Sequence, residues 1–184
     1  MIQELVDKND SILRQEMKPF DFGNPPIDPV VLYNDLAETM IEKGGIGLSA
    51  NQVGLPYRFF VMRAEEIIGC FNPKIVDFSA EQIILEEGCL SFPNLFVKIK
   101  RPKTIKVRYT LPDGETVTRK FDGMTARCFQ HELDHLNGVV YTKRANKIHL
   151  EKANKSSKQL SKYPVGLRTQ LSDKAKETIE WLKS

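Results

Sequence analysis

A hydrophobic period of about 3.6 residues begins just after the segment NPPIDP. The apolar positions that recur at this helical spacing are Val30, Tyr33, Leu36, Ala37, Met40 and Ile41. Pro29 suits the first turn of a helix, where a missing N–H leaves no bond unmade, and Gly44 suits its end. The pattern therefore predicts one amphipathic helix between these two residues.

Shorter apolar runs follow, of the length expected for strands. They are YRFFVM (57–62), IIGCF (67–71), KIVDF (74–78) and VKIKRPKTIKVRYTLPDGETVTRKF (97–121), whose Asp113-Gly114 step predicts a tight turn between strands. A second helix is predicted from about Met124 to Asn137, ended by Gly138. The segment GIGLSANQVG (45–54) is rich in glycine and is predicted to be a loop that exposes its backbone. The predicted fold class is α+β, with short antiparallel strands packed around a central helix.

The chain becomes polar and rich in lysine beyond Tyr141. We predict a main domain over residues 1–145 and a basic C-terminal extension over 146–184. A helical tail is expected at about 172–183, and the segment ANKSSKQLSKYPVGL (153–167) is expected to be an extended linker. Residues 142–184 contain 11 Lys or Arg and 4 Asp or Glu. This excess is usual for a solvated surface, and it also suits an arm that meets a polyanion such as RNA.

Length and composition narrow the class of protein. The 184 residues, 41% hydrophobic and 28% charged, fit one globular domain with or without an appendage. No apolar run approaches the roughly 20 residues of a membrane span, and the polar start MIQELVDKND resembles neither a signal nor a transit peptide. Three cysteines are too few and too irregular for a disulfide framework, which favours a reducing compartment such as the cytoplasm.

The segment QHELDHLNG (130–138) carries the candidate chemistry. His131 and His135 are four residues apart, so on a helix they share a face and can hold one metal ion. Glu132 lies next to the first of them, where it can transfer the protons of a water that the ion activates. A catalytic site of this kind usually has three protein ligands and one open position. A His-Glu-x-x-His pattern by itself also occurs in helices that bind no metal.

Several residues could provide the third ligand: Cys89, Cys70, Cys128, His149 or a carboxylate. Cys70 lies in an apolar run and is better read as core. Cys128 shares the helix of the two histidines, where a chelate on consecutive turns is hard to close. Cys89 lies in EEGCLSFP, whose Gly88 permits an unusual backbone that presents a thiolate and a free N–H.

Three stretches together resemble the signature motifs of the peptide deformylase family in order and spacing. They are GIGLSANQVG (45–54), EGCLSFP (87–93) and QHELDHLNG (130–138). The likeness extends from about Ile12 to Tyr141 and includes ILRQEMKP and the DLAETM helix. The resemblance implies a metal-dependent hydrolase that removes the formyl group from N-formylmethionyl peptides and releases formate.

The resemblance also implies roles for individual residues. The metal ligands would be Cys89, His131 and His135, and the ion Fe²⁺ in the cell, with Zn²⁺ or Ni²⁺ as alternatives. Glu132 would transfer protons. The side-chain amide of Gln52 and the backbone N–H of Leu90 would stabilise the oxyanion.

The peptide would add a strand along Gly45, Ile46 and Gly47 by main-chain hydrogen bonds. The methionine pocket would be lined by Ile46, Leu85, Met124, Cys128 and the ring of His131, with Glu87 nearby. Leu85, Met124 and Cys128 would fit equally well as plain core residues. Arg101 is expected to pair with Glu87 and hold the cysteine segment.

Two departures from the family pattern stand out. The first motif usually has alanine where Ser49 stands, and the NLFV stretch (94–97) is more apolar than usual. The basic extension suggests ribosome binding by analogy; no membrane and no sequence-specific nucleic acid is expected as a partner. The alternative functions are another metallohydrolase, such as a peptidase, and a ribosome- or RNA-binding protein whose metal is structural.

Overall fold

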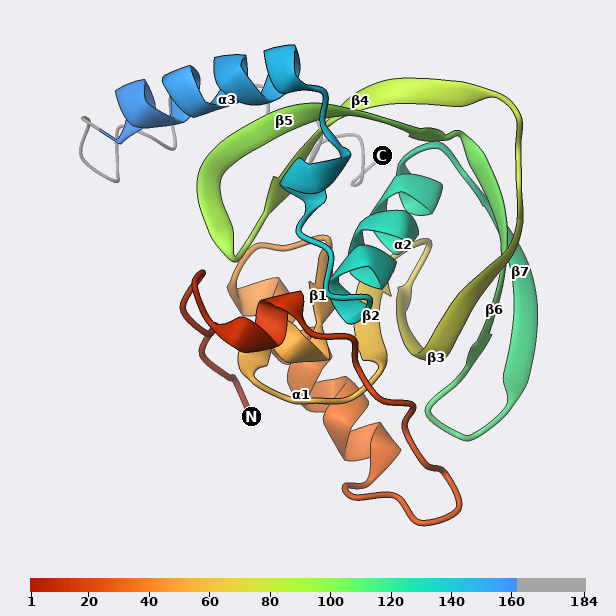
Figure 1. Ribbon diagram of the computed structural model, residues 1–184. Helices are drawn as coiled ribbons and strands as arrows, with labels where there is room; N and C mark the ends of the chain where they lie inside the picture. Colours follow the sequence, from red (N-terminus) through yellow and green to blue (C-terminus); the bar gives the residue numbers. More distant parts are fainter. Residues whose placement is uncertain (162–184) are drawn as a thin grey trace.

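The computed structural model describes residues 1–161 and places them in two antiparallel sheets and three α-helices (Figure 1). The helices are α1 (Pro29–Glu42), α2 (Gly123–Leu136) and α3 (Lys147–Leu160). The strands are β1 (Gly47–Ser49), β2 (Phe59–Arg63), β3 (Ile67–Phe78), β4 (Gln82–Cys89), β5 (Phe92–Pro102), β6 (Thr104–Thr110) and β7 (Thr116–Asp122). The larger sheet has the order β1-β2-β3-β6-β7, and β4 pairs with β5 in the smaller one. The predicted α+β class is confirmed.

Helix α1 begins and ends where the sequence predicts. The Asp28 carboxylate accepts hydrogen bonds from two backbone N–H groups of the first turn, which satisfies donors that the helix leaves free. Pro29 is the first helical residue, and Gly44 follows the end with a φ of +69°. Leu32, Leu36 and Met40 are completely buried. The outer positions of the apolar pattern are less covered, since Val30 and Ile41 are about half exposed.

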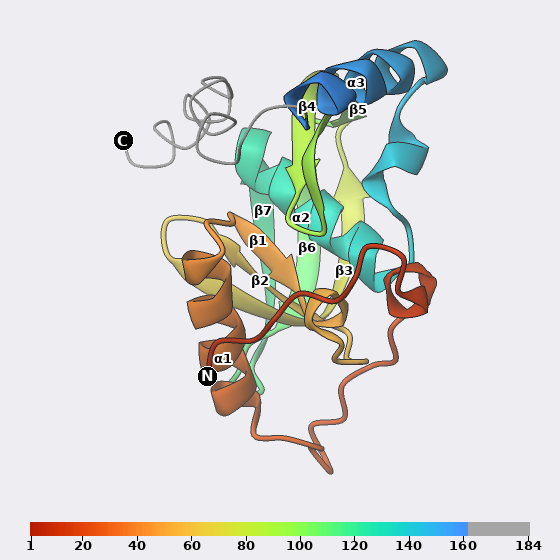
Figure 2. The ribbon, with the colours of Figure 1, turned by 90° about the vertical axis from the view of Figure 1, so that its left-hand side faces the viewer.

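Helix α2 is the centre of the molecule, between the larger sheet and the β4–β5 pair (Figure 2). Every residue from Ala126 to Leu136 is buried. Phe129 packs against aromatic rings of β2, β6 and β7. The predicted end at Gly138 has a physical reason: its φ is +67°, and a Cβ there would lie 2.7 Å from the backbone of Arg14.

The strands differ from the predicted ones in three respects. Residues 45–54 contain regular structure, because β1 pairs with β2 and is followed by the 3-10 helix η2 (Ala50–Val53). The segments 67–71 and 74–78 form one strand, β3, which continues through Asn72 at a φ of +49°. The Asn72 side chain bonds both the N–H and the C=O of Phe20, which stabilises this irregularity. Strand β4 was not predicted, although it holds Cys89.

The basic extension also differs from expectation. Its described part forms α3, so the predicted linker is wrong over residues 153–160. Asn146 caps the helix by accepting from the His149 N–H, and Leu150 and Ala153 pack into a cluster with residues of β5. The helix predicted at 172–183 lies outside the described residues, and the domain division at residue 145 stays a prediction. None of the helices within residues 1–161 has the length and apolar character needed to cross a membrane.

Candidate metal centre

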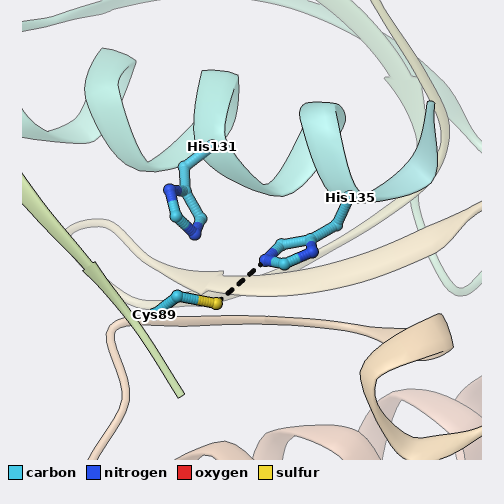
Figure 3. A group of neighbouring side chains, drawn as sticks. All are labelled: Cys89, His131 and His135. Atoms are coloured by element: carbon cyan, nitrogen blue, oxygen red, sulfur yellow. Dashed lines mark hydrogen bonds between the residues drawn. The ribbon is translucent and has the colours of Figure 1, made fainter. Parts of the chain in front are cut away.

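Three metal-ligating side chains converge between the end of β4 and helix α2 (Figure 3). His131 and His135 come from successive turns of α2, and Cys89 is the last residue of β4. Their ligand atoms all lie within 4.8 Å of one another, and the Cys89 Sγ is 3.2 Å from the His135 Nε2. Within residues 1–161 this is the one such group of three. One ion can therefore contact all three side chains.

The other candidates for the third ligand lie elsewhere. Cys70 is completely buried in β3. The Cys128 thiol points to the carbonyl oxygen of Ile46 at 3.4 Å, although it shares the helix of the histidines. The His149 Nδ1 is 3.1 Å from the carbonyl oxygen of Lys98. Burial raises the pKa of both the Cys70 and the Cys128 thiol well above its usual range, which disfavours the thiolate form that binds metals.

The donor set fits a divalent transition metal. The Nδ1 of His131 lies 3.0 Å from the Glu87 Oε2; a carboxylate accepts only, so Nδ1 carries the proton and Nε2 keeps its lone pair for a metal. Burial alone would raise the pKa of the Cys89 thiol, but the neighbouring imidazoles of His135 and His131 hold that pKa well below its usual range. A thiolate with two imidazoles suits iron, zinc or nickel and leaves a fourth position open.

A buried ion network fixes the strand of Cys89 to helix α2. Glu87 accepts from the Arg101 Nε at 2.6 Å and from Arg127 at 2.8 Å, in addition to His131. Arg101 also donates to Asp134 at 2.7 Å, and Asp134 accepts from Arg144 at 2.6 Å. Burial would raise the pKa of Glu87, but Arg101 and His131 hold it far below the usual carboxyl range.

The predicted Glu87–Arg101 pair is confirmed, whereas sequence reasoning missed Arg127 and Asp134. Both lie on the buried helix that carries the histidines. A charged residue on a buried helix needs a buried partner of opposite charge. The charges of Arg127 and Asp134 on this helix were therefore the signal that could have indicated the ion network.

Glu132 is buried beside the two histidines and forms part of the cavity wall. The Ser49 hydroxyl donates to its Oε2 at 2.7 Å. Burial raises the pKa of Glu132, and the charges of His131 and His135 oppose this rise only in part. Gly47 lies so close that a Cβ there would be 2.4 Å from the Glu132 Oε1. A side chain at position 47 would therefore displace the Glu132 carboxylate.

Gln52 lies in η2 with its side chain held in one orientation. Its Oε1 accepts from the Ser49 N–H at 2.9 Å. Its Nε2 therefore faces the other way, 3.0 Å from the Ser91 Oγ and 3.5 Å from the Cys89 Sγ. Leu90 follows Cys89 directly and lines the same cavity. The side-chain N–H₂ group of Gln52 and the residue with the second expected donor thus both lie next to Cys89.

A cavity of about 350 Å³ opens onto this group. Six of the residues expected to bind substrate line it: Gly45, Ile46, Gly47, Glu87, Met124 and Cys128. Leu85 is half-buried but is not among the lining residues. Phe92, Phe96 and Arg127 line the cavity and were not predicted. The Phe96 ring lies against Gly88, where a Cβ would be 2.6 Å from it, and the apolar NLFV stretch was the signal for this wall.

Comparisons with known proteins agree with this geometry. The family model for polypeptide deformylase matches residues 2–151. The peptide deformylase of Wolbachia pipientis wMel is 44% identical over 146 residues, which are 72% of this chain and 82% of that protein. The crystal structure of a peptide deformylase from Synechococcus elongatus in complex with actinonin superposes with a TM-score of 0.76 at 33% identity, covering 84% of this chain and 85% of the other.

A second solved structure, the class I type b peptide deformylase of Acinetobacter baumannii with Met-Ala-Ser bound, has a TM-score of 0.72 at 29% identity. It covers 78% of this chain and 98% of that one. The match to the family model covers far more than half of the chain, and it includes all three motifs and every residue of the site. This chain belongs to the polypeptide deformylase family.

Proposed function

We propose that this chain removes the N-formyl group from formylmethionyl peptides and releases formate, with Cys89, His131 and His135 as the ligands of a catalytic metal ion. The observation that carries this proposal is the convergence of the three ligand atoms at a cavity that also contains Glu132. A related enzyme from Acinetobacter baumannii has been crystallised with Met-Ala-Ser, a peptide that begins with methionine.

When bound, the ion acts as a Lewis acid that activates a water and polarises the formyl carbonyl. Glu132 takes the proton of that water and later gives it to the departing amine nitrogen. The burial that raises the pKa of Glu132 brings it nearer to neutral pH, where a group that must both accept and donate a proton works best. Glu132 is 4% exposed, which limits competing contact with solvent.

Negative charge on the formyl oxygen meets two donors from this chain. The Gln52 Nε2 is aimed at the cysteine by the bond between its Oε1 and the Ser49 N–H. The backbone N–H of Leu90, which follows Cys89 directly and lines the same cavity, is the second donor. Loss of one such preorganised donor typically lowers the rate by about 10²–10³. Gln52→Leu is therefore expected to lower turnover by that factor and to leave the metal content unchanged.

The peptide lies along Gly45, Ile46 and Gly47. Strand β1 begins at Gly47 and is an edge of the larger sheet, with β2 on one side. A peptide added on the other side is held through backbone groups, so the enzyme accepts many sequences after the first methionine. The methionine side chain enters the apolar part of the cavity beside Met124 and Cys128.

The ion in the cell is Fe²⁺, by analogy with the family, and Zn²⁺ or Ni²⁺ can replace it in the same thiolate and imidazole set. Metal analysis of protein purified without oxygen tests this assignment. Iron in a ratio of one per chain, together with loss of activity in air, is the expected result. Zinc alone in a fully active preparation would contradict it.

Glu132→Gln tests the activity itself and separates three functions. A deformylase variant of this kind retains its metal and its fold but releases no formate from formyl-Met-Ala-Ser. A peptidase would instead produce new amines from internal bonds of unformylated peptides. A binding protein with a structural metal would release no formate even as the wild type, and that result would overturn the proposal. Gln130→Glu would not serve as a control, because the Gln130 side-chain amide donates to the carbonyl oxygens of Pro102 and Ala126. Glu151→Gln changes an exposed glutamate on α3 and is the matched control.

The ribosome is the proposed partner that brings this enzyme to its nascent substrates in the cytoplasm. Helix α3 carries four exposed lysines, Lys147, Lys152, Lys155 and Lys158, and basic residues bind the phosphates of RNA with a strong dependence on salt. Replacing all four by glutamine is expected to weaken co-sedimentation with ribosomes and to flatten its salt dependence. Unchanged binding would reject α3 as the contact.

A further inference from the structure

Ser49 contacts both groups of this chain that are proposed to act on the reacting atoms. It is the last residue of β1 and is completely buried. Its hydroxyl oxygen lies 2.7 Å from the Glu132 Oε2 and 3.1 Å from the Glu132 carbonyl oxygen. Its backbone N–H donates to the Gln52 Oε1 at 2.9 Å.

The hydroxyl has one proton and therefore one bond to give. A distance of 2.7 Å is typical of a charge-assisted bond from a hydroxyl to a carboxylate, whereas 3.1 Å is long for an O–H donor. The carboxylate is also the stronger acceptor. The proton of Ser49 thus goes to Glu132 Oε2, and the contact to the helix carbonyl is secondary.

This bond makes the two oxygens of the Glu132 carboxylate different. Oε2 is turned into the protein toward Ser49. Oε1 lies against Gly47, a residue of the cavity wall, with no room for even a methyl group between them. None of the hydrogen bonds formed within residues 1–161 goes to Oε1, so its lone pairs stay available to a water in the cavity that Glu132 lines.

We propose that Ser49 is a positioning residue for the hydrolysis: its hydroxyl holds Glu132 so that Oε1 faces the cavity, while its N–H aims the Gln52 amide at the cysteine side of the same cavity. The proposal rests on the proposed function, since it assigns Glu132 the proton transfer. The hydroxyl itself exchanges no proton with substrate. Its contribution is to keep a buried side chain with three rotatable bonds in one reactive orientation.

A merely structural role makes a different prediction. If Ser49 only satisfied its own buried hydroxyl, removing the oxygen would change stability and leave Glu132 in place. Alanine fits the site sterically, because it is smaller and keeps the backbone N–H that holds Gln52. Ser49→Ala therefore removes the contacts of the hydroxyl with Glu132 and its capping-box contact with the first turn of η2, and it keeps the N–H that holds the Gln52 side chain. Ser49→Thr keeps a hydroxyl, and its branched side chain is suited to the extended backbone of Ser49, with φ −94° and ψ +147°.

The test combines kinetics with crystallography of the metal-loaded protein. For Ser49→Ala, kcat on formyl-Met-Ala-Ser is expected to fall about tenfold, since a hydrogen bond to a charged group is lost. KM should stay within about twofold, metal content should stay unchanged, and the Glu132 carboxylate should occupy more than one rotamer. Tm should fall by only about 2–4 °C, the effect of one lost buried hydrogen bond. Ser49→Thr is expected to recover most of kcat and a single carboxylate position.

Two results would overturn the proposal. One is a Ser49→Ala enzyme with wild-type kcat and the carboxylate still in its original place. The other is a lower kcat that is accompanied by an equal loss of metal. If the extra methyl group of threonine disturbs the buried site, the position of the Glu132 carboxylate in Ser49→Ala is the measurement that tests the proposal. Absence of formate release by the wild type would refute the proposed function instead, and the carboxylate position would still report on Ser49.

Discussion

Arg101→Met tests whether the buried ion network supports both the fold and the metal centre. Arg101 is 5% exposed, and its guanidinium joins Glu87 on the cysteine strand to Asp134 on helix α2. Methionine fills a similar length with apolar atoms but supplies no donor. The two carboxylates are then left buried with one partner fewer each.

The expected loss of stability follows from how many partners remain. Removing one partner of a buried ion pair typically costs about 3–5 kcal/mol. Here Glu87 keeps Arg127 at 2.8 Å and Asp134 keeps Arg144 at 2.6 Å, so neither charge is left alone. We therefore expect the lower end of that range, about 3 kcal/mol, which corresponds to a fall in Tm of about 6–12 °C for a chain of this length.

The metal centre should weaken with the fold, although Arg101 contacts no metal ligand. Glu87 holds the His131 ring through Nδ1, and such supporting bonds are worth about 10–100-fold in metal affinity. A loss of about tenfold is expected because Glu87 is loosened rather than removed. Thermal unfolding measures the first effect, and competition with a chelator of known affinity measures the second.

Arg144→Met is the matched control. It removes a guanidinium from the same Asp134, but the Arg144 side chain is 49% exposed, and ion pairs at such positions contribute about 0–1 kcal/mol. Its Tm should fall by no more than about 4 °C, with unchanged metal affinity. The reasoning is wrong if the two variants lose the same small amount of stability and both bind the ion as the wild type does.

Other perturbations probe the same site. Gly47→Ala adds a Cβ at 2.4 Å from the Glu132 Oε1 and 2.8 Å from the Cys128 Sγ, so kcat should fall at least about tenfold with metal retained; a normal kcat would contradict the close packing. After chelation at neutral pH, iodoacetamide should alkylate Cys89 first, because Cys70 and Cys128 are buried and burial raises the pKa of both thiols; mass spectrometry that finds either of these modified before Cys89 would contradict this order. The apparent Kd for the ion should rise as pH falls below about 6.5, since imidazole ligands must be neutral to bind; a Kd constant between pH 7 and pH 5 would argue against histidine ligation.

Local rules predicted the elements that carry their own signals. The Asp28 cap and Pro29 fix the start of α1, and Gly138 fixes the end of α2 through its positive φ. Helix α3 shows the opposite case. Its lysine-rich, weakly apolar sequence reads as a linker, but Leu150 and Ala153 pack against β5. Tertiary packing therefore supplies the stability that helix propensity alone does not.

The histidine pair and Glu132 could be predicted because a helix fixes the relation between residues four apart, whatever surrounds it. The family motifs added Cys89, yet its approach to the histidines depends on how the β4–β5 pair packs against α2, and Cys89 and His135 are 46 positions apart in the sequence. The bond from Ser49 to Glu132 joins residues 83 positions apart. The network of Glu87, Arg101, Arg127 and Asp134 likewise joins three elements, β4, β5 and α2. Short-range spacing determines which side chains share a face, whereas only the packing of sheets against α2 decides which faces meet, because burial of apolar surface is set by the whole chain.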